Sequence, residues 1–421
     1  MNIYERYKDS GIPWLGEVPE HWEIVPIRYL FQFKNNLRIP LSAEERGKII
    51  EKIYPYYGAS GIIDYVDNFI FDEDLILVAE DGANLLSRST PLAFIATGKY
   101  WVNNHAHILK PLSHIIKFWQ YLLQIYDFLP LISGSAQPKL TKDNLASILL
   151  PTPPVEEQTA IAHYLDTKLG EIDALIDKQQ TLLEKLAEQR TAVITQAVTK
   201  GLNPAAPMKK SGVEWLGDVP AHWDIKHSNQ IFKIHNGATP KTSEPDYWGD
   251  EIVWFTPKDL GDNQNKEIST SLKMITKEGY ENCGVSLAPA KSIALSKRAP
   301  IGHLAITLLP AVVNQGCFLL EVLAPNDVNY LYYWLYANKT TLNSFGQGST
   351  FMELPREKFA MLKISIPPKN EQTSIADYLD QETAKIDRLC ETVNQTIGRL
   401  KEYRTALITQ AVTGKIKVTD E

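Results

Sequence analysis

The chain has 421 residues, of which 44% are hydrophobic and 22% are charged, and its formal net charge is −7. At roughly 100–200 residues per domain this length predicts two to four domains, and the composition excludes wholesale disorder and a collagen-like fibre. No apolar run reaches the length of about 18 residues that a membrane span needs. The first ten residues lack the apolar core of a secretory signal. We therefore expect a cytoplasmic protein with no membrane partner.

Two sequence blocks occur twice, and their order decides the expected architecture. Residues 10–24 (SGIPWLGEVPEHWEI) match residues 211–225 (SGVEWLGDVPAHWDI) at ten of fifteen positions. Residues 157–199, which begin EQTAIAHYLD and end ITQAVT, match residues 371–413 at 22 of 43 positions. The chain therefore reads as a tandem duplication in which each copy encloses a divergent block.

The two divergent blocks share a plan although their sequences barely match. Each has short β-type runs, an aromatic-rich helix, a loop of small residues and an apolar strand that leads into two prolines. The runs are expected at 75–79, 252–255, 292–296 and 318–323, the helices at 114–128 and 328–337, the loops at 133–137 and 346–350, and the closing strands at 148–154 and 364–368. This plan predicts mixed α/β (α+β) domains.

The repeated segments that follow these strands predict long helices. From residues 165 and 379 onward, apolar positions step by four and three through four heptads, as in a coiled coil. A helix with one apolar stripe needs a partner, and the other copy is expected to pack against it in antiparallel orientation, as an internal pseudo-twofold repeat. The expected domains are globular at 1–155 and 203–368 and helical at 156–202 and 369–421.

No enzyme motif is present. The glycine-rich segments 58–61 and 346–348 lack the dinucleotide and P-loop patterns. The double prolines lack the flanking residues of an amino-methyltransferase motif, and Pro245-Asp246 is not followed by the lysine of a nuclease motif. The three cysteines, Cys283, Cys317 and Cys390, are too widely spaced for a zinc site and form no disulfide framework. We expect neither catalytic residues nor a metal site.

Histidines and aromatic residues have structural interpretations that are favoured over functional ones. His105 and His107 are expected as buried, hydrogen-bonded histidines rather than metal ligands. The repeated His21-Trp22 and His222-Trp223 pairs are expected to form a packing clasp. The aromatic helix residues are expected in the core, with a base-stacking platform as the alternative; they are Phe118, Trp119, Tyr332, Tyr333 and Trp334.

The doubled SG-x-x-WLG-x-VP-x-HW block, the doubled EQT-x-IA-x-YLD block and the doubled ITQAVT helix end resemble the DNA-specificity subunit of type I restriction–modification systems. The resemblance covers essentially the whole chain. It implies two target-recognition domains, each reading half of a bipartite gapped site in double-stranded DNA. It also implies repeat helices that set the spacing and dock two modification (methyltransferase) subunits, with restriction subunits joining that core. S-adenosylmethionine, ATP and Mg²⁺ would belong to these partners, and this chain would hold no cofactor.

Polar loop residues are the candidates for DNA contact, because loops on a rigid scaffold carry recognition. In the first block they are Lys34, Ser60, Ser135, Gln137 and Lys139; in the second they are Thr239, Lys241, Lys258, Arg298, Gln347, Ser349 and Thr350. Apolar helix residues outside the main stripe are the candidates for binding a modification subunit, with packing on the chain's own globular blocks as the alternative. They are Ile161, Leu175, Leu182, Ile194, Ile375, Leu389 and Ile408.

The acidic net charge argues against a free-standing DNA binder, but the charge is unevenly placed. Residues 156–200 hold 5 basic and 8 acidic residues, whereas residues 223–365 hold 14 of each. The excess of acidic residues is thus concentrated on the first long helix, where protein partners are expected. The alternative to a DNA reader is a two-headed adaptor that grips two protein ligands, which would not need the loop cations named above.

Overall fold

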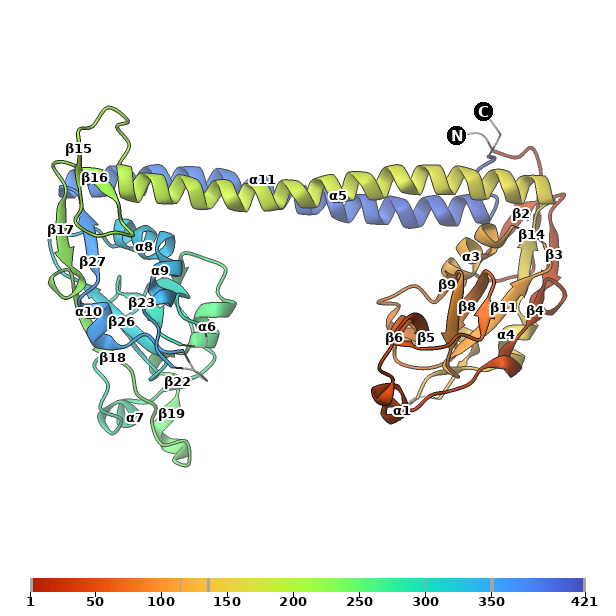
Figure 1. The fold of residues 1–421 in the computed structure, drawn as a ribbon, viewed down its shortest axis with the longest axis horizontal. Coiled ribbons are helices and arrows are strands. Elements are labelled where there is room, and N and C mark those ends of the chain that lie inside the picture. Colours follow the sequence, from red (N-terminus) through yellow and green to blue (C-terminus); the bar gives the residue numbers. More distant parts are fainter. Residues whose placement is uncertain (1–2, 114, 135–136, 299, 349–351, 419–421) are drawn as a thin grey trace. The chain divides into compact units, whose positions relative to one another are not determined.

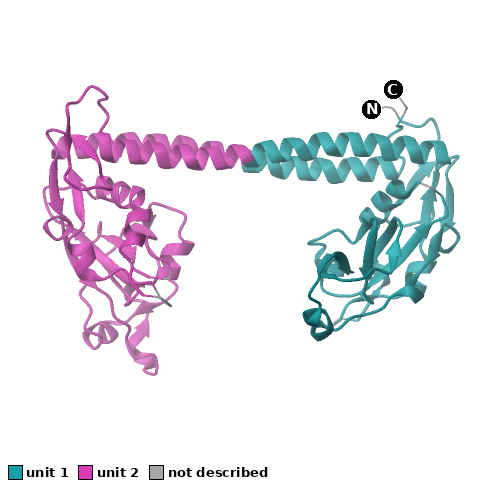
Figure 2. Cartoon of the chain, viewed as in Figure 1, with its two compact units in different colours: residues 1–180, 394–421 teal, residues 181–393 magenta. Residues whose placement is uncertain are grey.

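The computed structural model describes residues 3–113, 115–134, 137–298, 300–348 and 352–418. It divides into two compact units, Met1–Gln180 with Asn394–Glu421 and Thr181–Val393, which Figure 2 colours separately. We call the globular part of the first unit, residues 3–154, head 1, and that of the second unit, residues 203–368, head 2. The expected α/β fold with two long helices is confirmed.

The described part of head 1 contains two four-stranded sheets. The first has the order β4 (Phe31–Phe33), β11 (Ala106–Pro111), β8 (Leu75–Ala79), β9 (Ala93–Ala96), and the second the order β6 (Gly61–Val66), β5 (Tyr54–Gly58), β10 (Lys99–Val102), β7 (Phe71–Asp72). Paired strands are β1 (Tyr7–Asp9) with β2 (Glu17–Pro19), β3 (Glu23–Pro26) with β14 (Leu149–Thr152), and β12 (Ile132–Ser133) with β13 (Lys139–Leu140). The helices are α1 (Ala43–Lys48), α2 (Asn84–Ser87), α3 (Ile116–Ile125) and α4 (Lys142–Ser147), with short 3-10 turns at Ile27–Tyr29, Asn35–Leu37 and Leu129–Leu131.

The described part of head 2 repeats this organisation. One sheet has the order β18 (Phe232–Asn236), β26 (Cys317–Val322), β23 (Ile293–Ser296), β24 (Leu304–Thr307), β21 (Glu267–Ile268), and the other the order β19 (Trp248–Gly249), β22 (Met274–Ile275), β20 (Ile252–Phe255), β25 (Ala311–Val313). Paired strands are β15 (Met208–Lys210) with β16 (Asp218–Pro220) and β17 (Asp224–His227) with β27 (Lys363–Ile366). The helices are α6 (Pro257–Asp262), α7 (Lys277–Glu281), α8 (Val328–Ala337), α9 (Lys339–Ser344) and α10 (Arg356–Ala360), with short 3-10 turns at Ser228–Gln230 and Pro245–Tyr247.

The inner strands of the five-stranded sheet of head 2, β26, β23 and β24, are buried on both faces, which explains why they are almost continuously apolar. Along β23, Ile293 and Leu295 belong to a core shared with the helices, whereas Ala294 belongs to a core shared with the second sheet. Alternate residues of a strand point to opposite faces of its sheet. The sheet is therefore the middle layer of the head, between a helical layer and a second sheet.

The two long helices are α5 (Val155–Lys200) and α11 (Lys369–Val412), labelled in Figure 1. Both end at a glycine in the left-handed region, Gly201 with φ +73° and Gly414 with φ +69°, as helices commonly do. For this reason α11 is shorter than the expected segment 369–421. Within each unit the two helices run antiparallel and bury the expected stripe, which includes Leu165, Leu186 and Leu407.

Candidate nucleic-acid interface

The repeated sequence blocks join each head to its helix. Glu157, near the start of α5, accepts hydrogen bonds from Trp22 Nε1 at 2.9 Å and from the Tyr4 hydroxyl at 2.9 Å, and it lies 2.5 Å from His21 Nε2. In the second unit Glu371 accepts from Trp223 Nε1 at 3.1 Å and lies 2.7 Å from His222 Nε2. Both tryptophans are fully buried. The expected packing clasp is confirmed.

Burial raises the pKa of Glu157, but the hydrogen bonds from Trp22, His21 and Tyr4 outweigh it and lower that pKa below its usual value. The carboxylate is therefore held ionised in the first turn of α5, where a negative charge is favoured by the helix dipole.

The aromatic helices dock the heads against the same positions of the two repeat helices. In the first unit the Tyr121 hydroxyl donates to Asp166 at 2.7 Å, and in the second the Tyr333 hydroxyl donates to Asp380 at 2.5 Å. Asp166 and Asp380 are equivalent in the repeat. Trp334 is fully buried, as are Phe118 and Trp119, while Tyr332 and Tyr333 are nearly so. Their placement in the core confirms the structural interpretation and removes the stacking platform.

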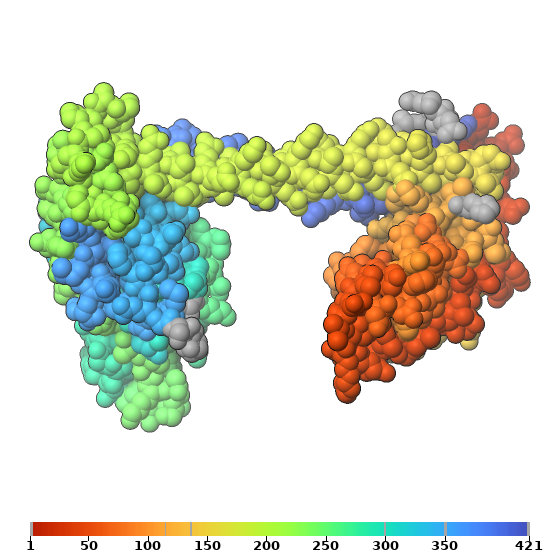
Figure 3. All heavy atoms as spheres, in the orientation of Figure 1, coloured from red at the N-terminus to blue at the C-terminus, as the bar shows by residue number. Residues whose placement is uncertain are grey.

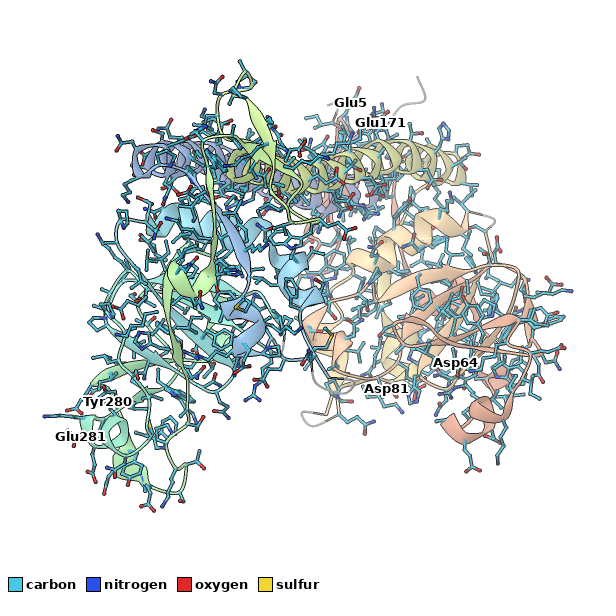
Figure 4. All side chains as sticks on the ribbon, turned by 60° about the vertical axis from the view of Figure 1, so that its left-hand side comes forward. Glu5, Asp64, Asp81, Glu171, Tyr280 and Glu281 are labelled. Carbon is cyan, nitrogen blue, oxygen red and sulfur yellow. The ribbon has the colours of Figure 1, made fainter. Side chains whose placement is uncertain are left out.

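Each head has an open hollow at the end of a parallel strand pair, β5 with β10 in head 1 and β20 with β25 in head 2. In head 1 the hollow is lined by Ser42, Arg46, Asn103, Asn104 and His105, among others. Asp81, which contacts His105, is labelled in Figure 4 at the end of head 1 that is remote from α5. The label of Glu171 marks α5 in the same view. Polar side chains thus gather where the repeated blocks leave the head uncovered.

The hollow of head 2 has a volume of about 490 Å³ and holds two of the candidate cations, Lys258 and Arg298. Thr256, His303 and Asn314 also line it. Arg298, just after β23, and Lys258, on α6, are far apart in sequence, so their convergence was visible only in the fold. A cationic hollow with amide and hydroxyl groups can bind phosphate or base edges.

The candidate DNA-contact residues of head 1 differ in solvent exposure and in their ion pairs. Ser60 and Gln137 are exposed in loops. Lys139 is half-exposed and lies 3.3 Å from Glu80, whereas Lys34 is nearly buried and ion-paired with Glu73. Ser135 lies outside the described residues.

The candidates of head 2 are mostly accessible. Lys241, Lys258 and Gln347 are exposed, and the Thr239 hydroxyl is hydrogen-bonded to Gln315. Ser349 and Thr350 lie outside the described residues.

The choice of polar loop residues from the sequence did not include several residues that line the two hollows. They are Arg46, Asn103, His105, His303 and Asn314. One signal was available for two of them: an asparagine follows valine at the end of a strand in both blocks, as Asn103 and Asn314.

Four of the apolar helix candidates are corrected by the structure. Ile161, Ile194, Ile375 and Ile408 are buried at 2% exposure or less, because they pack within their own units. They cannot offer a docking surface. The other three are exposed on the helices: Leu175 at 45%, Leu182 at 41% and Leu389 at 53%.

The two neighbouring histidines have different environments. His107 is buried, with Asn35 Nδ2 at 2.8 Å and the Leu140 carbonyl at 2.7 Å, as expected. His105 is 47% exposed and pairs with Asp81, so its expected burial was wrong, because it precedes β11 instead of lying within it. The described residues include no group of three or more potential metal ligands. None of the described helices combines the length and apolarity needed to cross a membrane.

Comparison with known proteins places the chain in a family. The family model of the type I restriction modification DNA specificity domain matches residues 19–185 and again residues 220–399. The MjaIX specificity subunit of Methanocaldococcus jannaschii is 36% identical over 170 residues, but this match spans only 39% of the present chain and 38% of that relative. The EcoDI specificity subunit of Escherichia coli is 20% identical over 95% of this chain and 90% of its own length.

Solved structures share the fold. A chain from a structure concerning complex assembly and conformational transition of the type I restriction–modification system superposes with a TM-score of 0.68 at 17% identity, covering 94% of this chain and 98% of that chain. The HsdS subunit from Thermoanaerobacter tengcongensis gives a TM-score of 0.54 at 16% identity, with the same coverage. Because the two family matches together span most of the sequence, the protein belongs to the type I restriction–modification DNA-specificity family.

Proposed function

We propose that this protein is the sequence-recognition subunit of a type I restriction–modification complex, in which each head reads one half of a bipartite gapped site in double-stranded DNA. The recognition domains would be residues 1–155 and 203–368. The observation that carries the proposal is that the two heads share one framework and fill its hollows with different polar side chains. Two readers of the same shape and different chemistry suit a site with two unlike halves.

The helices, residues 156–202 and 369–421, would set the spacing of the half-sites and bind two modification subunits. Leu175 and Leu389 are equivalent in the repeat and both are exposed. Figure 3 shows atoms of α5 at the surface on the face that is drawn. Equivalent exposed leucines in each unit suit one modification subunit per unit.

The chemistry would reside in the partners. Modification subunits would supply S-adenosylmethionine and transfer its methyl group to adenine, and restriction subunits would supply ATP- and Mg²⁺-dependent cleavage. Phosphate contacts from these partners would offset the acidic charge of the helix, which is 5 basic against 8 acidic residues over 156–200.

The test is to assemble the chain with its cognate modification subunit and to map the methylated adenines in DNA treated with the complex. The proposal predicts one gapped site with two unlike halves, and two modification subunits per chain by native mass spectrometry. Methylation without a gapped site, or any other stoichiometry, would contradict it. Tight binding of protein ligands without DNA binding would favour the two-headed adaptor instead.

A further inference from the structure

Strand pairing defines which residues of the two heads are equivalent. Ala79 of β8 lies opposite Ala106 of β11, and Ser296 of β23 lies opposite Cys317 of β26. After each inner strand the chain makes the same backbone hydrogen bond: Glu80 N donates to the His105 carbonyl at 2.9 Å, and Lys297 N donates to the Gly316 carbonyl at 2.9 Å. Glu80 is therefore equivalent to Lys297, and His105 to Gly316.

The next residues carry opposite charges in the two heads. Asp81 of head 1 corresponds to Arg298 of head 2, since each follows the residue just matched. Asp81 forms an isolated antiparallel bridge with Lys139, and Arg298 forms one with Glu353. The charges of the pair are thus exchanged between the heads. The first residue is acidic and its bridge partner basic in head 1, whereas the first is basic and its partner acidic in head 2.

Next to these inverted pairs, different side chains line the equivalent hollows of the two heads: His105 in head 1 and Arg298 in head 2. In head 1, both carboxylate oxygens of Asp81 lie 2.8–2.9 Å from His105 Nδ1. In head 2 the matching position is Gly316, where a Cβ atom would lie 3.2 Å from Arg298 Nε. The missing side chain leaves room for the guanidinium, and Glu353 lies 3.6 Å from its Nη1. His105 and Arg298 therefore occupy equivalent places: His105 lies against Asp81, and Arg298 lies against Glu353, which also pairs with Lys297 at 2.7 Å.

The two anchored groups have complementary hydrogen-bonding chemistry. An ionised carboxylate only accepts, so the Nδ1 atom of His105 carries a hydrogen, and in the neutral imidazole Nε2 is then an acceptor. Arginine only donates, and its fork matches the O6 and N7 acceptors of guanine in the major groove. An acceptor instead suits the amino group of cytosine or adenine.

We propose that His105 and Arg298 are base-reading residues at one equivalent position of the two half-sites. Arg298 reads a guanine in the half-site of head 2, and His105 reads a base with an exposed amino group in the half-site of head 1. This inference rests on the proposed function, because it assumes that each head contacts DNA.

The experiment uses the chain assembled with its modification subunits and duplex oligonucleotides built on the site mapped with the unaltered complex. Each base pair of both halves is replaced in turn, and methylation is measured in competition. Arg298→Lys keeps the charge but loses the fork, so it should reduce discrimination at one G·C pair by roughly ten- to a hundredfold. Discrimination in the other half should be unchanged. His105→Ala should relax one position in the opposite half only.

Lys258→Ala is the matched control, because Lys258 lines the same hollow as Arg298. As a phosphate contact it should weaken methylation evenly across all duplexes. Circular dichroism checks that every variant is folded. If folded Arg298→Lys weakens all duplexes evenly, or changes none, the inference is wrong while the proposed function stands. If the unaltered complex prefers no duplex, the proposed function and this inference both fail.

Discussion

Asp173 and Arg404 meet across the antiparallel helices of the first unit, with Arg404 Nε 3.0 Å from Asp173 Oδ1. The same contact recurs in the second unit between the equivalent residues Asp387 and Arg190. Arg190 and Arg404 occupy positions in the otherwise mostly apolar stripe. A polar residue at such a position fixes the register of a coiled coil at a cost in stability. The duplication therefore sets one register twice.

Reversing one charge of this pair should destabilise the helices. Asp173→Lys would place two positive charges together and lower the free energy of unfolding by about 0.5–1 kcal/mol, since the pair is partly exposed. Adding Arg404→Glu should restore most of that loss in a double-mutant cycle measured by chemical denaturation. Glu171→Lys, on the exposed side of α5, is the control and should show no coupling to Arg404→Glu.

The Glu157 clasp should make stability depend on acid. Because hydrogen bonding lowers the pKa of Glu157 in the folded state, its contribution is complete above the unfolded value, about 4.3. It is lost as the pH falls through the lower folded value. Glu157→Gln should cost about 1–2 kcal/mol at neutral pH, and its stability should fall less steeply than that of the unaltered chain below about pH 4.3.

The neighbouring exposed residue provides the control for the clasp. Glu156→Gln should leave the acid dependence of the unfolding midpoint unchanged, since Glu156 is exposed. Parallel pH profiles for Glu157→Gln and the unaltered chain would show that the clasp does not act through its charge.

Leu175 and Leu389 should each hold one modification subunit. Leu175→Glu or Leu389→Glu would put a charge into an apolar interface, so native mass spectrometry should show one bound subunit instead of two. The double variant should bind none. Leu112→Glu, at a head position with 66% exposure, should retain two. Full binding by the double variant would place the docking surface elsewhere.

Lengthening both helices should lengthen the gap in the DNA site. One added heptad after Gln179 and another after Val393, its equivalent in the repeat, keep the apolar stripe continuous and add roughly 10 Å. At about 3.4 Å per base pair along one strand, the methylated site should keep both halves and gain roughly three base pairs between them. Four residues added after Gln179 alone should add roughly 6 Å, or one to two base pairs. An unchanged gap would mean that the helices do not set it.

Periodicity was sufficient to predict much of the fold. The strands Leu75–Ala79 and Ile252–Phe255 and the helix Val328–Ala337 have the expected bounds. These elements are buried, so their residues form apolar runs that can be recognised in a short window of sequence. The helix expected at 114–128 is shorter, Ile116–Ile125.

The site depends on contacts that sequence spacing does not reveal. Lys34 was predicted as a loop cation available to DNA, but it pairs with Glu73, which is 39 residues away along the chain. The equivalence of Asp81 and Arg298 is hidden because the two charges are opposite, so only strand pairing reveals it. Ile161 and Ile375 lie off the main stripe and are nevertheless buried.

The central claim is that each head reads its half-site independently, and exchanging one head tests it most directly. Residues 22–150 would be replaced by the corresponding block of a family member with a different site, and the methylated adenines would be mapped by single-molecule sequencing. The account predicts that one half of the gapped site changes to that of the donor while the other half and the gap remain. A change in both halves, or in neither, would contradict it.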